Sequence, residues 1–367
     1  MPSFRTAQVT EILSERPGLQ RLRVRMGDDS ESRAYAVTQL TGTCAVGDQL
    51  VLNTTAVELG LGTGGWHVVH WNLEREEFVE PGPEHIMKLR YTSLQFDAGT
   101  DELGHPEIDL PLGGVPVAVC SVHSQVATVA AAFADAAPGR RLVYVMTDGA
   151  SLPIALSDLV VAMRDKGLVH STVTAGHAFG GDKEAVTVAS ALGLAVHVLG
   201  ADAVVVGMGP GVVGTGTRLG TTGIEVAPIL DTVVALGGTP VLCVRASSGD
   251  HRDRHRGVSH HTRTVLALTG AEPWIAHVPE EAADLSGVRV AEVADGPTAA
   301  ELFDRLDLQV TTMGRTVHED PLFFAACTAA GRLLAQRTLD PSERHDRSGP
   351  DDPSGPDDPP GAPADTP

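Results

Sequence analysis

The chain has 367 residues, 42% of them hydrophobic, and a formal net charge of -20. Its length and hydrophobic content indicate a globular protein long enough for two domains. So acidic a chain offers little basic surface to nucleic-acid phosphates, and we expect no nucleic-acid partner. No apolar run approaches the roughly 18 residues of a membrane span and no signal pattern opens the sequence, so we expect a cytoplasmic protein with no membrane partner.

Residues 1–77 are expected to form a small all-β domain, a barrel or a sandwich. Five short runs with partial alternation of apolar and polar residues are separated by turn formers such as Arg16-Pro17-Gly18. Residues 78–114 form a bridging segment rich in acids and proline. Within it, residues 85–92 alternate, and an extended strand would place Lys88 and Arg90 on one face. That face either covers a domain junction or closes as a basic arm over an anionic ligand.

Residues 115–338 alternate between apolar strands and helical patterns, which predicts a Rossmann-like domain. Strands buried on both faces indicate a doubly wound, mostly parallel sheet with helices on both sides. Ser259 is expected to cap a helix that begins at His260. Residues 339–367 are rich in Pro, Asp, Ser and Gly and are expected to form a disordered acidic tail. The four cysteines form no CxxC pair and are expected to be buried free thiols, as in a reducing compartment.

One stretch, Ala201 to Pro228, stands out because an apolar strand opens into a loop that contains seven glycines. Glycine lets a ligand approach the backbone, so successive N–H groups can converge on an anion. The expected ligand contacts of this segment are Gly209, Gly211, Gly214, Thr215, Gly216, Thr217, Arg218 and Glu225.

Residues 209–214 of this loop also match GxGxxG, the fingerprint of dinucleotide binding. Three later glycines interrupt the helix that this fingerprint requires, and no acid ends the next strand. A nicotinamide dinucleotide is therefore a lesser alternative to a phosphate, a carboxylate or another nucleotide. A purely structural glycine turn also stays open.

Imidazole, carboxylate and guanidinium groups follow most of the strands predicted in residues 115–338. The carboxyl ends of parallel strands meet at one edge of a sheet, so we expect these groups to share a site. The candidates for acid–base catalysis are His123, Asp148, His177, Asp182 and His260. Further candidates for ligand contact are Arg256, His261 and, from the bridging segment, Lys88.

Some of these side chains have the donor types of a Zn, Mn or Fe site. If a divalent metal binds, its ligands would come from His177, Asp182, His260 and His261. No local spacing such as HExxH supports this site, so packing or helix capping by a histidine stays open as well. Asp182, beside a helix expected over residues 183–199, can equally complement the helix dipole. A Ser124–His123 nucleophile is disfavoured because no GxSxG elbow surrounds Ser124.

Several long motifs together resemble a known family. They are PEHIMKLRYTSLQ at 83–95, MTDGASLPIALS at 146–157, TAGHAFGGDKEAVTVASAL at 174–192, GMGPGVVGTGTRLGTTGIE at 207–225 and RHRGVSHHTRTVL at 254–266. In this order they resemble the bacterial family catalogued as domain of unknown function 3866, from the β-rich start to about residue 336. The resemblance implies no particular activity, cofactor or site residue.

The sequence thus predicts a protein that binds a small anionic metabolite at the carboxyl-end loops of its sheet. If the protein is an enzyme, it also transforms that metabolite. A non-catalytic sensor or scaffold with the same pocket is the first alternative, and a metal-dependent hydrolase is the second. Whether the chain is an enzyme stays open at this stage. A homo-oligomer is compatible with these patterns.

Overall fold

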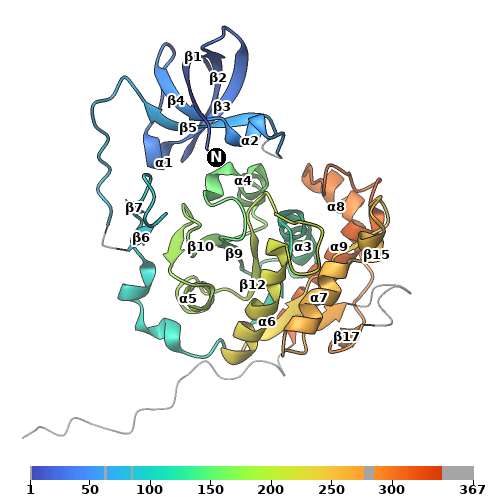
Figure 1. Ribbon diagram of the computed structural model, residues 1–367. Coiled ribbons are helices and arrows are strands. Elements are labelled where there is room, and N and C mark those ends of the chain that lie inside the picture. The colour runs from blue at the N-terminus through green and yellow to red at the C-terminus, as the bar shows by residue number, and fades with distance from the viewer. Residues whose placement is uncertain (1, 62–63, 84–85, 277–284, 341–367) are drawn as a thin grey trace, which may run out of the picture.

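The computed structural model describes residues 2–61, 64–83, 86–276 and 285–340. They form a small β-barrel that sits at one end of a larger α/β domain (Figure 1). This architecture confirms the fold class expected from the sequence. From residue 341 onward, the tail expected at 339–367 lies outside the described residues.

The N-terminal barrel closes through five strands in the order β1-β2-β3-β5-β4. All neighbours are antiparallel except β3 and β5, which run parallel. Side chains alternate as a barrel requires: Ala34 and Ala36 of β3 face the core, and Tyr35 between them faces outward. The strands are β1 (Phe4–Arg16), β2 (Leu19–Met26), β3 (Glu31–Val37), β4 (Gln49–Asn53) and β5 (Trp66–Asn72), with short helices α1 (Thr38–Thr41) and α2 (Thr55–Glu58).

The bridging segment contains only a small hairpin of β6 (Met87–Lys88) and β7 (Phe96–Asp97), followed by short helical turns at Asp101–Gly104 and Pro106–Asp109. The expected extended strand over residues 85–92 is wrong beyond Lys88, and residue 85 lies outside the described residues. Leu89 and Tyr91 adopt positive φ angles of 51° and 61°, which turn the chain away from an extended course. Lys88 and Arg90 therefore do not share one strand face.

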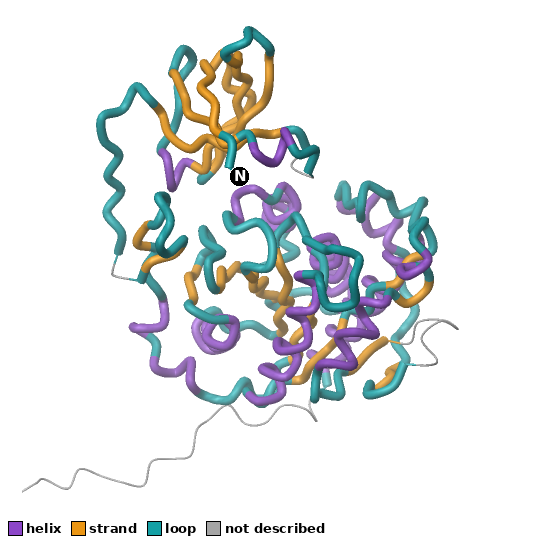
Figure 2. The backbone as a smooth tube through the Cα atoms, viewed as in Figure 1, coloured by secondary structure: helices purple, strands orange, loops and turns teal. Residues whose placement is uncertain are grey.

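The α/β domain is built on eight parallel strands in the order β11-β10-β9-β12-β8-β13-β16-β17. Val143 and Val145 of β9 belong to a hydrophobic cluster that includes side chains of helices α5 (Val188–Gly193), α6 (Val226–Ala235) and α7 (His260–Leu268). Tyr144 between them belongs to a second cluster, with side chains of α3 (His123–Ala136), α4 (Asp158–Asp165), α8 (Ala299–Leu306) and α9 (Pro321–Leu339). Both faces are thus covered, as Figure 2 shows. The strands are β8 (Pro116–Val119), β9 (Leu142–Thr147), β10 (Ser171–Ala175), β11 (Lys183–Ala185), β12 (Ala203–Met208), β13 (Thr239–Leu242), β16 (Trp274–Ala276) and β17 (Arg289–Ala291).

Helix starts follow their capping residues. Ser259 accepts a hydrogen bond from the His261 N–H at the start of α7, which confirms the predicted cap, and Ser157 caps α4 in the same way. The helices are α3 (His123–Ala136), α4 (Asp158–Asp165), α5 (Val188–Gly193) with a π-helical turn (Leu194–Val198), α6 (Val226–Ala235), α7 (His260–Leu268), α8 (Ala299–Leu306) and α9 (Pro321–Leu339). None of the helices in the described residues is long and apolar enough to cross a membrane.

The helix expected over residues 183–199 begins later than predicted. Lys183–Ala185 instead forms the edge strand β11, which pairs with β10, and α5 starts only after the Thr187 cap. Asp182 therefore precedes a strand, and the explanation that it complements a helix dipole is wrong. Between α8 and α9, Thr312 and Arg315 form an isolated antiparallel bridge.

The order of the strands places a topological switch point at the carboxyl ends of β8 and β12. These strands are neighbours, yet the helices that follow them, α3 and α6, cover opposite faces of the sheet. Connections that leave in opposite directions open a space at the sheet edge, which is where α/β proteins usually bind ligands. The glycine-rich segment directly follows β12 at this switch point.

Candidate functional site

The glycine-rich loop, residues 209–221, folds into a compact turn beyond β12. Gly214 forms a bridge with Thr221, and the Thr215 N–H donates to the Gly220 carbonyl at 2.7 Å. The Thr215 and Thr217 hydroxyls lie 2.9 Å apart and bond within the loop. Glycine is required at Gly209, where a Cβ would lie 2.7 Å from the Ser151 carbonyl oxygen. These contacts give the loop a defined conformation, so it can form one wall of a binding site.

A cavity of about 130 Å³, here called the basic pocket, lies between this loop and the segment that follows β13. Its most telling residue is Arg245, which is only 6% exposed. Arg245 Nη1 donates to Nδ1 of His261 at 3.0 Å, and no carboxylate in the described residues pairs with its guanidinium. The lining residues are Val212, Val213, Gly214, Gly216, Thr221, Arg245, Arg252, Arg254, His255, His261 and Met313.

The arginines of the basic pocket differ in how they are neutralised. Arg252 pairs with the buried Asp250 at 2.6 Å. Arg254 is exposed and makes no ion pair within the described residues. A Cβ at Gly216, whose φ is 83°, would come within 3.4 Å of Arg254 Nη2, so glycine lets this guanidinium lie against the loop. Neither Arg245 nor Arg254 forms an ion pair within the described residues. The carboxylates of Asp250 and Asp320 attract the Arg245 guanidinium without contacting it, and both are themselves paired with other arginines.

Three histidine rings cluster beside these arginines. The rings of His255, His260 and His261 have centroids 4.2 to 5.0 Å apart. Burial, with the nearby Arg245 charge, lowers the pKa of His255 to about 4 and that of His261 to about 3. Both are neutral at neutral pH. Because Arg245 donates to Nδ1 of His261, the proton of that neutral ring sits on Nε2, which is left as a donor.

The same cluster is the one group of three metal-ligand side chains in the described part of the chain. One nitrogen from each of His255, His260 and His261 lies within 4.8 Å of the others. Nε2 of His260 is buried without a hydrogen-bond partner among the described residues, which suits a coordinating imidazole. The donation from Arg245 into His261 opposes a metal, because a ligating histidine normally donates its second N–H outward.

Two of the predicted metal ligands lie elsewhere and have other partners. Asp182 accepts hydrogen bonds from Arg164 at 2.7 Å and from the Thr172 N–H at 2.8 Å. Nδ1 of His177 accepts from the Leu89 N–H at 3.0 Å, while the His177 N–H donates to Asp148. His177 and Asp148 therefore tie the bridging segment to the sheet edge, and neither lines the basic pocket.

Two further candidates are buried with complete sets of partners. His123 donates from Nδ1 to the Met208 carbonyl at 3.1 Å and accepts at Nε2 from Ser157 at 2.6 Å. Burial lowers its pKa to about 4. Lys88 lies 2.5 Å from Glu184 and donates to two backbone carbonyls. Both side chains hold elements together in this structure, and their roles in catalysis or binding stay predictions.

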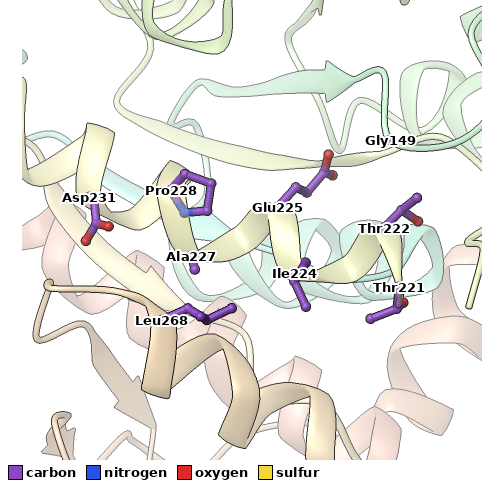
Figure 3. Close-up of a pocket in the computed structure, with 9 residues that line it drawn as sticks. All are labelled: Gly149, Thr221, Thr222, Ile224, Glu225, Ala227, Pro228, Asp231 and Leu268. Atoms are coloured by element: carbon purple, nitrogen blue, oxygen red, sulfur yellow. The ribbon is translucent and has the colours of Figure 1, made fainter. Parts of the chain in front are cut away.

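Glu225 lines a neighbouring cavity of about 450 Å³. In Figure 3 its carboxylate points toward Gly149, where a Cβ would lie 2.5 Å from Glu225 Oε2. The Thr147 hydroxyl donates to Glu225 at 2.6 Å. Burial, offset by this hydrogen bond and assisted by Asp148, raises the pKa of Glu225 to about 7. A carboxyl group with this pKa can exchange protons at neutral pH.

The remaining predicted contacts are placed at the rim or outside. Arg218 is exposed, and Arg256 is exposed and donates to the Asp250 carbonyl. The prediction missed Arg245, Arg254 and His255 as site residues. A signal was present for Arg245, since a strand that reads VLCVRA places an arginine where a buried parallel strand normally ends in apolar residues.

This fold defines a two-domain protein in which a doubly wound parallel sheet follows an N-terminal β-barrel. Within that class, the chain belongs to the family described as "Protein of unknown function (DUF3866)", whose model matches residues 33–331. The match begins within β3 and ends within α9, so it covers most of both domains. Comparison with curated proteins and with solved structures gives no match.

Proposed function

We propose that this protein binds a small anionic metabolite through a phosphate or carboxylate group seated in the basic pocket. The observation that carries the proposal is Arg245, a guanidinium at 6% exposure with no carboxylate partner in the described residues. Burying a charge without a direct ion-pair partner is costly, and the Asp250 and Asp320 carboxylates near Arg245 already pair with other arginines. An anionic ligand supplies that partner.

The surrounding groups suit an anion because they are donors. Arg245 and Arg254 bring fixed positive charge, and Nε2–H of His261 adds a neutral donor. The glycine-rich loop forms the opposite wall, where Gly214 and Gly216 expose backbone to the pocket beside Val212, Val213 and Thr221. Phosphate and carboxylate share this recognition chemistry, and arginine binds both in the same forked geometry.

The test compares ligands and variants by thermal shift and calorimetry. Phosphate, nucleotides, sugar phosphates and dicarboxylates are added to the full chain, and at least one class is expected to raise the unfolding temperature. Arg245→Met should abolish that shift. Arg218→Met is the matched control, because it removes the same charge from an exposed position of the glycine-rich loop and should keep binding. No shift with any anion at millimolar concentration contradicts the proposal.

Metal-assisted hydrolysis is a second candidate, supported by the unpartnered Nε2 of His260 and the three close imidazoles. Elemental analysis of the natively purified protein tests it. One equivalent of a transition metal that disappears in His260→Ala would favour this candidate. A metal-free protein that still binds anions would reject it.

The acid–base group that a catalytic version needs is Glu225, whose raised pKa supports proton transfer near neutral pH. A non-catalytic sensor would use the basic pocket alone. Turnover that is lost in Glu225→Gln while ligand affinity persists would distinguish an enzyme from a sensor. The four cysteines are free and buried, which supports a reducing cytoplasmic location.

A further inference from the structure

A third cavity, larger than the other two, adjoins the basic pocket. It measures about 990 Å³ and lies between the barrel and the carboxyl-end loops of the sheet, here called the apolar cleft. Figure 1 shows the barrel facing this end of the α/β domain. Its lining is predominantly aliphatic and aromatic, with Arg21 as its one charged residue. The cleft has the size of a typical small-molecule site.

The barrel wall of the cleft is an apolar face where a solvated one is expected. Tyr35 and Val37 of β3 point outward, and on the adjacent strand Val68 lies in register with Tyr35. Trp66 continues this face, with the Arg33 guanidinium 4.7 Å from its ring centroid. Contiguous apolar surface on the outside of a barrel usually marks a binding surface.

The opposite wall is formed by three sheet loops that are hydrogen-bonded into one surface. The Phe179 N–H donates to the Leu152 carbonyl at 3.0 Å, which joins the loops after β10 and β9. The Ser151 N–H donates to the Pro210 carbonyl at 3.0 Å, which joins the glycine-rich loop to them. Phe179 itself is buried and packs edge-on against Phe96, with ring centroids 5.0 Å apart. This wall is therefore preorganised.

The two walls are also held at a defined distance. Arg16 and Arg21 of the barrel both pair with Asp158 at the start of α4, at 2.6 and 2.8 Å. Arg16 also donates to the Ala155 carbonyl at 3.1 Å. Exposed ion pairs alone are weak, but several at one edge define the docking geometry of the barrel.

The apolar cleft and the basic pocket share a boundary. Val212, Val213 and Gly214 of the glycine-rich loop line both cavities, and so does Met313. An anion held by Arg245 would thus lie directly beside a large apolar space. From this juxtaposition we infer that the ligand is an amphiphile, a phosphate or carboxylate head group that carries a hydrocarbon body held in the apolar cleft. The inference rests on the proposed function of the basic pocket.

The lining also argues against a polar body. Sugars and nucleobases need a set of hydrogen-bond partners, whereas the cleft residues are chiefly Val, Leu, Pro, Phe, Trp, Tyr and Met. Every methylene that enters the cleft should strengthen binding several-fold. The free energy that discriminates this ligand from inorganic phosphate would come from the barrel face.

The experiment uses the full chain and calorimetry with four probes, each below its micelle concentration. Dodecyl phosphate and dodecanoate test the two head groups, inorganic phosphate tests the head alone, and dodecanol tests the body alone. At least one of the two amphiphiles is expected to bind 100-fold or more tightly than inorganic phosphate and dodecanol. The better of the two identifies the head group.

Two valine variants locate the body. Val68→Asn, in the apolar cleft, should weaken binding of the amphiphile at least tenfold and leave phosphate binding unchanged. Val51→Asn is the matched control, because this outward-facing barrel valine does not line the cleft. Equal effects of the two variants, or amphiphiles that bind no better than phosphate, would overturn the inference. In that case phosphate binding that is lost in Arg245→Met would still uphold the proposed function. If no probe binds, the inference fails, and the nucleotides, sugar phosphates and dicarboxylates of the thermal-shift test then decide the proposed function.

Discussion

Arg245 Nη1 donates a hydrogen bond to Nδ1 of His261 at 3.0 Å, and both side chains are buried. This one contact orients the guanidinium toward the basic pocket and assigns the imidazole proton to Nε2. It joins the segment that follows β13 to the first turn of α7. The two groups present donors and no acceptor toward the cavity, which is the basis of the anion assignment.

Removing the Arg245 charge is expected to leave the ligand-free protein at least as stable as the wild type. Burial, followed by repulsion from Arg252, lowers the pKa of Arg245 to about 10. The folded state therefore holds this charge at a cost of ~3 kcal/mol at neutral pH. In Arg245→Met, urea unfolding at pH 7 should show an unchanged or higher free energy of unfolding.

The control for this measurement is Arg218→Met, which should leave stability within about 0.5 kcal/mol of wild type because Arg218 is exposed. A loss of more than ~1 kcal/mol in Arg245→Met would mean that the guanidinium is chiefly a structural link between β13 and α7. The charge would then need no ligand to explain it.

Anion binding should become tighter as the pH falls from 7 to 5. Burial and the nearby arginines lower the pKa values of His255 and His261 to about 4 and 3 in the free pocket. A bound anion stabilises the imidazolium form and raises these pKa values, so the complex takes up protons. Sulfate is the suitable probe because it does not titrate in this range.

Calorimetry in buffers of different ionisation enthalpy measures the uptake directly. His255→Gln and His261→Gln should each reduce the proton uptake, and the double variant should remove the pH dependence. An affinity for sulfate that is independent of pH in the wild type would contradict the role of these histidines at the anion.

The parallel sheet is predictable from the sequence, and the glycine-rich and RHRGVSHH segments do line one pocket beyond the carboxyl ends of its strands. Apolar runs such as Ala203–Val206 are typical of strands buried in a parallel sheet, and for this reason the sheet could be predicted. The sequence could not predict which arginines pair with a carboxylate and which do not. Arg252 and Arg254 look alike in the sequence. The local course of the chain decides that Asp250 pairs with Arg252, two residues later, and that Arg254 makes no ion pair in the described residues.

The expected convergence of His177 with the RHRGVSHH segment was not found for a similar reason. The seven residues between β10 and β11 were expected to lead into a helix, but they connect two neighbouring parallel strands. That short connection carries His177 to Asp148 and the bridging segment. Pairing between strands so close in sequence has no local signature, since parallel neighbours are normally linked by longer crossovers.

Lys88 is expected to contribute to stability and to leave ligand affinity unchanged. Lys88→Met leaves Glu184 buried without its ion-pair partner, which should lower the free energy of unfolding by about 3 kcal/mol or more. The double variant Lys88→Met/Glu184→Gln should recover part of that loss. Chemical denaturation and phosphate titration of each variant check both statements. If Lys88→Met weakens binding without a loss of stability, Lys88 belongs to the ligand site after all.

Glu225 should make the protein less stable as the pH rises from about 4.5 to 7. Burial raises its pKa to about 7 in the folded state, so the protonated form contributes stability at low pH that is lost as the pH rises through this value. The expected difference is up to ~3 kcal/mol between the two ends of the range. Urea unfolding of the wild type and Glu225→Gln at pH 5 and pH 8 measures it.

Glu225→Gln should remove this part of the pH dependence, because the amide keeps the shape of the side chain and does not titrate. Asp148→Asn is the second comparison: the Asp148 charge helps to raise the pKa of Glu225, so its removal should shift the transition to lower pH. A wild type and a Glu225→Gln variant with the same pH dependence would show that Glu225 titrates as an ordinary exposed carboxylate. It would then be unsuited to general acid–base work near neutral pH.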